Sequence, residues 1–202
     1  MKAIDFWFSI GSTYSYLSIM RLDAVSRTTG VGFRWRPFNV RAIMIEMENR
    51  PFVGKPVKTA YMWRDIERRA AMYGIPATLP APYPLEELEF ANRVALVGAD
   101  EGWCADYVRA TYVRWFQHGE PAGVEPNLTG SLQEVGQDAE RVLALARSPE
   151  IDAALERVTE EAKALGVFGS PTFVVDDELF WGDDRLEDAI SWRQRGASAS
   201  SD

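Results

Sequence analysis

The sequence predicts an α/β fold in which one domain is formed by both ends of the chain and an all-helical segment is inserted between them. Three observations predict this arrangement. Residues 1–38 show the pattern strand, helix, strand, and residues 39–166 keep the helical spacing of apolar side chains. Residues 167–202 then return to a strand hairpin and one helix. We therefore expect a discontinuous α/β domain at 1–38 and 167–202, and a helical domain at 39–166.

The first segment begins with an apolar, aromatic strand at about 2–9, which Gly11 ends. A helix is expected to start at Ser12 and to end before Gly30. A second strand is expected at about 32–38, because apolar and basic residues alternate there. Strand, helix and strand of this length form a right-handed βαβ unit with parallel strands.

The middle of the chain consists of helical segments separated by breakers, of which the clearest is the stretch at 74–84, rich in Pro and Gly. One helix carries an aromatic series that indicates helical core or a subunit interface rather than a substrate-binding wall. This series is Trp103, Tyr107, Tyr112, Trp115 and Phe116. The expected helices lie at about 39–48, 57–73, 86–101, 103–117, 128–136, 139–147 and 149–165.

The last part of the chain is predicted to be a hairpin at 169–182 with an acidic turn at 176–178. Pro171 is expected at the first residue of a strand, and the Ser-Pro-Thr sequence around it favours a cis peptide. An amphipathic helix should follow at about 184–194. The tail at 196–202 is small and polar, and we expect it to be disordered.

Composition and charge exclude several classes of function. The formal net charge is −8 and the isoelectric point is about 4.8, which disfavours nucleic-acid binding through a basic surface. No apolar run approaches the roughly 20 residues that a membrane span needs, and no secretory signal is evident. The sequence therefore predicts a cytoplasmic protein without nucleic-acid or membrane partners.

The chain has one cysteine, Cys104, and one histidine, His118. A single cysteine excludes an intrachain disulfide and a dithiol redox cycle within one chain. Cys104 lies in an apolar helical run and is expected to be a buried small hydrophobe, and His118 is expected near the C-terminal end of that helix. Transition-metal sites of the His and Cys type would have too few ligands here.

Ser12 stands between the first strand and the first predicted helix, beside backbone N–H groups that have no helical partner. Such a position suits an anion or a thiolate. The spacing Ser12-x-x-Ser15 is that of a redox Cys-x-x-Cys motif with both sulfurs replaced by oxygen, so dithiol chemistry is disfavoured. The alternative is that Ser12 is a plain helix N-cap.

Two further motifs indicate a ligand site near the end of the chain. A cis Pro171 would leave the backbone groups of Ser170 facing outward and unpaired, where an extended, peptide-like ligand could add as a strand. Asp183 and Asp184 follow Gly182 at the start of the last helix. A carboxylate there could pair with a ligand ammonium while free N–H groups take a carboxylate, which would hold the head of an α-amino acid.

In this order, and with the helical insertion between them, these motifs resemble the thioredoxin-like proteins of the DsbA class. They are more similar to the family of 2-hydroxychromene-2-carboxylate isomerases and kappa-class glutathione transferases. The matching residues are Asp5-Phe6-x-Phe8-x-x-x-Ser12-x-Tyr14-Ser15-Tyr16-Leu17, Asn49-Arg50-Pro51, Lys58-x-x-Tyr61-x-x-x-Asp65, Tyr73-Gly74-Ile75-Pro76, Phe168-Gly169-Ser170-Pro171-Thr172-Phe173 and Trp181-Gly182-Asp183-Asp184-Arg185-Leu186.

The resemblance implies a thioredoxin-like domain, glutathione as cofactor and a homodimer. Ser12 would hydrogen-bond the glutathione sulfur, the Ser170 backbone would pair with the cysteinyl unit, and Asn49 would contact the tripeptide. Asp183 and Asp184 would hold the γ-glutamyl head. The implied glutathione site comprises Ser12, Asn49, Ser170, Trp181, Gly182, Asp183 and Asp184. Thr13 stands where family members often have Pro, and Asp183 where the isomerases often carry Asn.

An acceptor substrate is expected between the two domains, where ligand clefts commonly form. Four residues are candidates to hold its carboxylate or hydroxyl groups. They are Arg41, Arg50, Lys58 and Tyr83. The expected substrate is a small aromatic or unsaturated carboxylate.

The resemblance implies a glutathione-dependent cis–trans isomerase of aromatic catabolism. A thiolate could add to an electron-poor double bond, allow rotation about the single bond and leave again. If the sulfur stayed attached, the reaction would be a transfer, so a kappa-like glutathione transferase or peroxidase is one alternative. A non-catalytic, thioredoxin-like module that binds peptides is the other.

Overall fold

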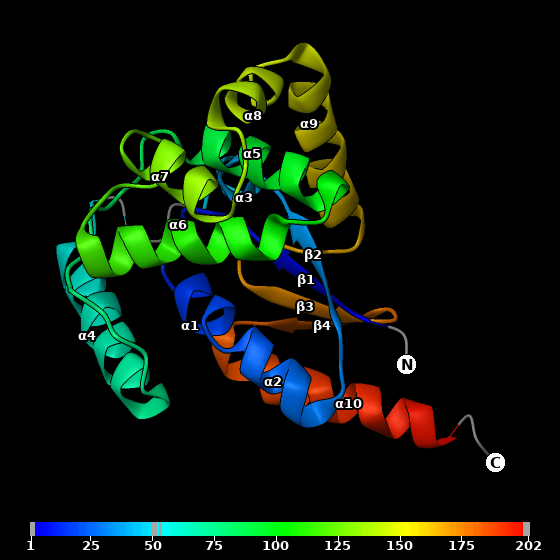
Figure 1. The fold of residues 1–202 in the computed structure, drawn as a ribbon. Helices are drawn as coiled ribbons and strands as arrows, with labels where there is room; N and C mark the ends of the chain where they lie inside the picture. The colour runs from blue at the N-terminus through cyan, green and yellow to red at the C-terminus, as the bar shows by residue number, and fades with distance from the viewer. Residues whose placement is uncertain (1–2, 50–51, 53, 200–202) are drawn as a thin grey trace.

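The computed structural model describes residues 3–49, 52 and 54–199, and within them a four-stranded sheet has the order β2-β1-β3-β4 (Figure 1). Strand β1 pairs in parallel with β2 and antiparallel with β3, which pairs antiparallel with β4. Both ends of the chain thus build one sheet, as predicted. The strands are β1 (Ile4–Phe8), β2 (Phe33–Pro37), β3 (Thr172–Val175) and β4 (Glu178–Trp181).

Strand β1 is aromatic on both faces because both faces are covered. Phe6 and Phe8 lie on one face, where Phe6 stacks on Phe173 with ring centroids 5.3 Å apart. Trp7 points to the other face and meets Phe38 edge-on at 6.0 Å. A strand buried on both sides loses the alternation of apolar and polar residues, which explains the continuous apolar run.

The first predicted helix is wrong in its start and in its continuity. The structure has a short helix α1 (Ser15–Ile19) and a separate helix α2 (Leu22–Thr29). Ser12 lies in the loop before α1, where its N–H donates to the Ser9 carbonyl at 3.0 Å. The break follows from a tight turn in which the Arg21 N–H donates to Ser18. Gly30 ends α2 in a left-handed conformation, as expected.

The segment between β2 and β3 is helical, which confirms the predicted insertion. Helix α4 starts with Pro56 at its first position and ends before Gly74, which adopts φ 67°. His118 ends α6 before a left-handed Gly119. The helices are α3 (Val40–Glu46), α4 (Pro56–Tyr73), α5 (Leu88–Glu101), α6 (Cys104–His118), α7 (Asn127–Glu134), α8 (Ala139–Ala146) and α9 (Pro149–Ala164).

The predicted aromatic series of α6 forms core. Tyr107, Tyr112, Trp115 and Phe116 are fully buried, and Phe116 stacks on Tyr16 of α1 at 4.1 Å. Cys104 is also buried, which confirms its prediction as a small hydrophobe. The core therefore joins the insertion to the helix that follows β1.

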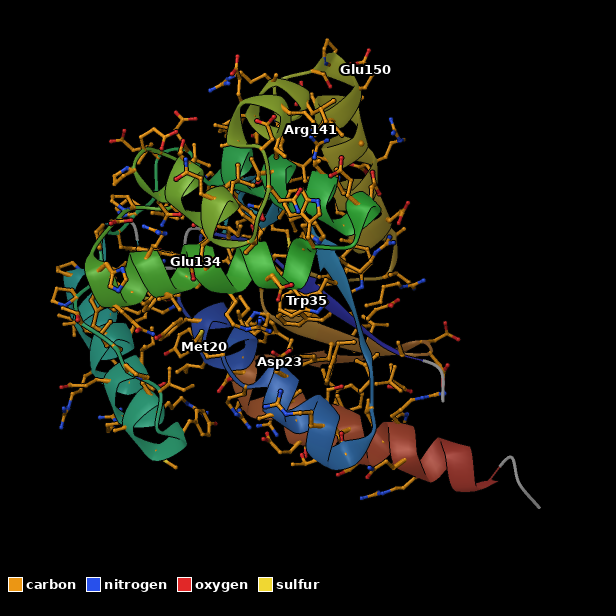
Figure 2. All side chains as sticks on the ribbon, viewed as in Figure 1. Met20, Asp23, Trp35, Glu134, Arg141 and Glu150 are labelled. Carbon is orange, nitrogen blue, oxygen red and sulfur yellow. The ribbon has the colours of Figure 1, made fainter. Side chains whose placement is uncertain are left out.

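Helices cover both sides of the sheet. In the view of Figure 1, α2 and α10 lie below the sheet and α5, α8 and α9 lie above it. Helix α10 contacts β1, β3 and β4, whereas α5 and α9 contact β2. Charged side chains such as Glu134, Arg141 and Glu150 project from the outer helices (Figure 2). No helix among the described residues combines the length and the apolar character that crossing a membrane requires.

The last helix is longer than predicted. A 3-10 turn, η1 (Asp183–Arg185), precedes α10 (Leu186–Ala199). The tail was expected to be disordered from residue 196, but the helix includes residues 196–199, where alanines favour helix. Residues 200–202 lie outside the described part of the chain.

Candidate active site

A cleft of about 670 Å³ lies between the loop after β1, helices α3 and α4, and the loop that precedes β3. It brings together residues that are more than 150 positions apart in the sequence, Ser12 and Ser170 among them. Arg50 lies outside the described residues. The predicted site residues that line the cleft are Ser12, Arg41, Asn49, Lys58, Tyr83, Ser170 and Trp181.

Ser12 lines this cleft. Its Oγ donates to the Ser170 carbonyl at 2.6 Å and accepts a long hydrogen bond of 3.4 Å from the Ser15 N–H. The Ser170–Pro171 peptide is cis, as predicted. The Ser170 carbonyl was expected to be unpaired, but in the structure it is the acceptor of the Ser12 hydroxyl.

Ser12 lies outside helix α1, so it gains little from the dipole of that helix. Tyr14, not Ser12, is the N-cap of α1, and α1 is only five residues long. A helix this short has a small dipole, so the hydroxyl proton itself is the group that can stabilise an anion here.

A group of serine hydroxyls lies around the Ser170 side chain, next to the cleft. The Ser170 side chain accepts a hydrogen bond from the Ser9 N–H and lies 2.8 Å from the Ser15 hydroxyl. Ser15 is fully buried and therefore faces the protein interior. The Ser170 side chain was not among the predicted contacts, since its partners lie far away in the sequence.

The charged groups of the cleft are cationic. Arg41 donates to the Leu85 carbonyl at 2.5 Å and to the Glu86 carbonyl at 3.3 Å, and Lys58 lies 5.6 Å from the ring of Phe52. No Asp or Glu lines the cleft in the part of the chain that the structure describes. The cleft is thus suited to an anionic ligand.

Tyr14, Tyr61 and Tyr83 line the cleft, and the pKa values of Tyr14 and Tyr83 are shifted by their surroundings. Burial raises the pKa of Tyr83, although Arg41 opposes this rise. Tyr14, which sequence reasoning missed as a site residue, donates to the Asp65 carboxylate at 3.0 Å. Burial and then the charge of Asp65 raise the pKa of Tyr14. Both tyrosines are therefore neutral at physiological pH.

Trp181 forms one wall of the cleft. Its ring lies 4.8 Å from that of Phe168 and covers the backbone at Gly169. A Cβ atom on Gly169 would come within 2.3 Å of the Trp181 Nε1. The glycine therefore permits the indole to lie close to the loop that carries Ser170.

The two adjacent aspartates occupy different environments. Asp183 is 2% exposed and accepts hydrogen bonds from Ser18, Arg21 and Arg69 at 3.0, 3.4 and 3.3 Å. Burial raises the pKa of Asp183, and the two arginines oppose that rise. The direct contact of Asp183 with a ligand stays a prediction, which its geometry disfavours because the carboxylate is buried among protein partners and does not line the cleft. Asp184 also lies outside the residues that line the cleft, but its side chain is 44% exposed.

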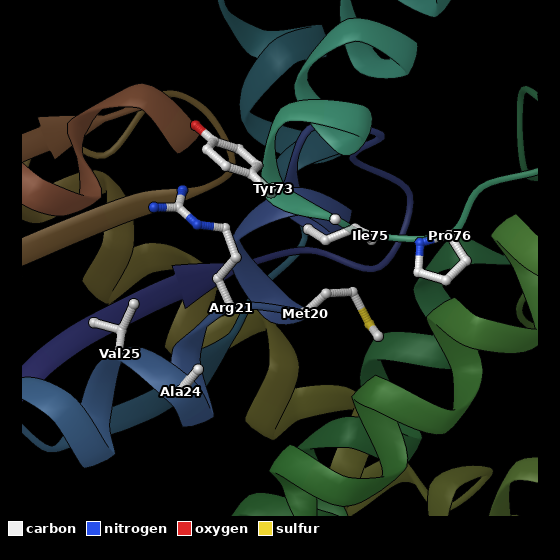
Figure 3. Close-up of a pocket in the computed structure, with 8 residues that line it drawn as sticks. Met20, Arg21, Ala24, Val25, Tyr73, Ile75 and Pro76 are labelled. Atoms are coloured by element: carbon white, nitrogen blue, oxygen red, sulfur yellow. The ribbon is translucent and has the colours of Figure 1, made fainter.

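A smaller pocket of about 290 Å³ lies on the outer side of this ion network, between the start of α2 and the end of α4 (Figure 3). The guanidinium of Arg21 lies over the ring of Tyr73 at 3.9 Å. None of the predicted site residues lines this pocket. The 670 Å³ cleft is therefore the candidate active site.

Comparison with known proteins identifies the family. The family model described as the DSBA-like thioredoxin domain matches residues 3–190. The chain belongs to the DsbA-like thioredoxin family. This finding confirms the resemblance that the sequence motifs predicted.

Similar proteins within this DsbA-like group carry enzyme names. A 2-hydroxychromene-2-carboxylate isomerase from Sphingobium xenophagum is 33% identical over 188 residues, which cover 92% of this chain and 95% of that protein. Glutathione s-transferase kappa 2 from Caenorhabditis elegans is 25% identical, with 92% and 88% covered. A solved structure of a 2-hydroxychromene-2-carboxylate isomerase superposes with a TM-score of 0.88 at 26% identity, covering 99% of this chain and 98% of that one.

Proposed function

We propose that this DsbA-like protein is a glutathione-dependent isomerase of the 2-hydroxychromene-2-carboxylate isomerase type that acts in the breakdown of aromatic compounds. One observation carries the proposal. Ser12, whose hydroxyl donates to the Ser170 carbonyl, lines the same cleft as Arg41 and Lys58. The Sphingobium isomerase, 33% identical over nearly the whole chain, supports this choice of reaction.

The cleft has the donors that glutathione would need. A free thiol has a pKa of roughly 8.5 and is mostly protonated at neutral pH, so a stabilising donor is required. Bound glutathione would supply a thiolate that adds reversibly to an electron-poor double bond and leaves unchanged after rotation. In our proposal the Ser12 hydroxyl turns from the Ser170 carbonyl toward the sulfur.

The remaining site residues would bind glutathione and the acceptor substrate and orient them. Lys58 and Arg41 would neutralise carboxylates of glutathione and of the acceptor, while neutral Tyr83 would donate a hydrogen bond. Asp184 does not line the cleft, but it follows the cleft residue Trp181 by three positions, and its exposed carboxylate would pair with the γ-glutamyl ammonium. Trp181 would exclude water from one wall. Asn49 lines the cleft and would contact the tripeptide.

Calorimetric titration with glutathione and thiolate absorbance as a function of pH test this function. We expect binding, a bound thiol with a lowered pKa, and isomerisation of an unsaturated aromatic carboxylate at catalytic amounts of glutathione. Absence of binding at millimolar glutathione would contradict the proposal. If extended peptides bound instead, without preference for glutathione, a peptide-binding module would be favoured.

A kappa-like glutathione transferase is the second candidate, and the kappa-class relatives from Caenorhabditis elegans favour it. The two reactions differ in the fate of glutathione. An isomerase leaves its concentration constant over many turnovers, whereas a transferase consumes one glutathione for each conjugate. Measuring free thiol together with product therefore distinguishes them.

A further inference from the structure

The hydroxyl of Tyr112 lies directly beneath the loop that carries Ser12. It is shared between the Ser12 carbonyl at 3.0 Å and the Ser9 carbonyl at 3.2 Å. Tyr112 belongs to α6 in the inserted helices and is fully buried, and it does not line the cleft. A residue from the insertion thus holds the backbone of the candidate active-site loop from the interior.

The ring of Tyr112 is fixed by its neighbours. It stacks on Phe116 and Tyr16, with centroids 5.9 and 6.2 Å away. Burial raises the pKa of Tyr112, and hydrogen bonds with the Gly11 backbone and the Ser15 side chain oppose this rise without reversing it. The hydroxyl therefore remains protonated and offers a donor with a defined direction.

The conformation of the loop from Ser9 to Tyr14 depends on hydrogen bonds from the protein interior, such as those from the Tyr112 hydroxyl. Helix α1 begins only at Ser15, so helical hydrogen bonds do not fix the peptide of Ser12. The Ser12 hydroxyl would have to leave the Ser170 carbonyl to reach a sulfur, while its backbone keeps its place. The Tyr112 hydroxyl holds the carbonyl of that same residue.

We infer that Tyr112 is a positioning residue, whose hydroxyl fixes the Ser12 peptide so that the Ser12 side chain can stabilise a glutathione thiolate. The inference rests on the proposed function. Tyr112 touches neither substrate nor cofactor and acts through Ser12. A misplacement of about 1 Å in a reacting group can lower a rate a hundredfold, so a fixed peptide at Ser12 matters for the rate.

The substitution Tyr112→Phe removes only the hydroxyl and keeps the ring in the core. We expect it to raise the pKa of the bound glutathione thiol by about one and to lower turnover at neutral pH about tenfold. Glutathione affinity at high pH, where the thiol is ionised without help, should change less than about threefold. Thiolate absorbance during a pH titration measures the first effect.

Tyr107→Phe is the matched control. Tyr107 is equally buried on the same helix, and among the described residues its hydroxyl makes no hydrogen bond to the loop from Ser9 to Tyr14. We expect this variant to keep the wild-type thiol pKa. An equal shift in both variants, or loss of stability in Tyr112→Phe with an unchanged thiol pKa, would overturn the inference.

A double-mutant cycle separates positioning from a general structural role. In a Ser12→Ala background, Tyr112→Phe should produce no further rise in the pKa of the bound thiol, because the group that it positions is gone. A full, additive rise would contradict the inference. Wild-type protein that binds no glutathione would instead contradict the proposed function, so the two failures are distinguishable.

Discussion

The Ser12 hydroxyl donates to the Ser170 carbonyl, with the two oxygen atoms 2.6 Å apart, so a bound sulfur must compete with the carbonyl oxygen for this donor. A thiolate is the stronger acceptor because it is charged, and charge-assisted hydrogen bonds are roughly twice as strong as neutral ones. The neutral thiol lacks this advantage. The contribution of Ser12 is therefore expected to appear in the ionised state of the ligand rather than in its affinity alone.

We predict that Ser12→Ala raises the pKa of the bound glutathione thiol by about one and lowers turnover at neutral pH at least tenfold. Without the donor the charged form is less stable, so the rising limb of the pH–rate profile should move to higher pH. Ser148→Ala, which removes the N-cap of α9, should leave that limb in place. An unchanged limb in Ser12→Ala would refute the role of Ser12.

Asp183 and Asp184 offer a second test, because these neighbours in sequence share Arg69 as an ion-pair partner but differ in burial. Asp183→Ala should reduce the free energy of unfolding by about 2–3 kcal/mol, since Arg21 and Arg69 lose their shared buried carboxylate. Asp184→Ala should cost less than about 1 kcal/mol in stability and weaken glutathione binding roughly tenfold. Urea unfolding measures the loss of stability, and calorimetry measures the loss of glutathione binding. If Asp183→Ala weakened glutathione binding and Asp184→Ala did not, Asp183 would be the residue that binds the ligand.

Among the elements, α5 holds the backbone that follows β1 and leads to the candidate site. Asn92 of α5 is fully buried, and its side chain accepts a hydrogen bond from the Ile10 N–H at 2.8 Å. It also donates to the Ile10 carbonyl at 3.0 Å and to the Ser9 hydroxyl at 3.2 Å. One side-chain amide thus satisfies the backbone where β1 has ended, as a neighbouring strand would.

We predict that Asn92→Ala lowers the free energy of unfolding by about 3 kcal/mol, because buried backbone groups lose their partners. Amide hydrogen exchange at Ile10 should become faster than in the wild type. Asn127→Ala is the control, since Asn127 is equally buried but bonds to the carbonyls of Thr111 and Glu120. Faster exchange at Ile10 in both variants would argue against a specific role of Asn92.

The sequence predicted most elements, since periodicity and breakers are local signals. In the described part of the chain, the strands and the seven helices of the insertion lie within a few residues of their expected positions. The errors arise where contacts between distant residues decide the conformation. The Ser12 loop is non-helical, with Asn92 and Tyr112 bonded to its backbone, and neither residue can be paired with it from periodicity.

The same distinction between local signals and distant contacts holds for the candidate site. Ser12, Ser170 and Trp181 could be proposed because each stands at a break that local sequence reveals, and all three line the cleft. The burial of Asp183 was not predictable, since its arginine partners come from α4 and from the turn before α2, more than 110 residues away. Its neighbour Asp184 is also an aspartate but stays half-exposed, so residue type alone could not show which of the two is buried.

In the molecule as a whole, an acidic protein surrounds a cationic cleft. The net charge of −8 repels an anionic ligand at long range, whereas Arg41 and Lys58 attract it within the cleft. These opposing fields differ in their response to salt. At 0.15 M ionic strength the Debye length is about 8 Å, so the repulsion from distant charges is screened while contacts in the cleft persist in part.

We therefore predict that Lys58→Gln weakens glutathione binding about tenfold at low salt and reduces the dependence of its Kd on salt concentration. Arg141→Gln is the control, because it changes the net charge equally but removes a cation that pairs with Glu101 and does not line the cleft (Figure 2). That variant should change the Kd less than twofold. Equal losses in both variants would mean that affinity follows the overall charge of the protein, and the local cationic cleft would then have no part in selecting its ligand.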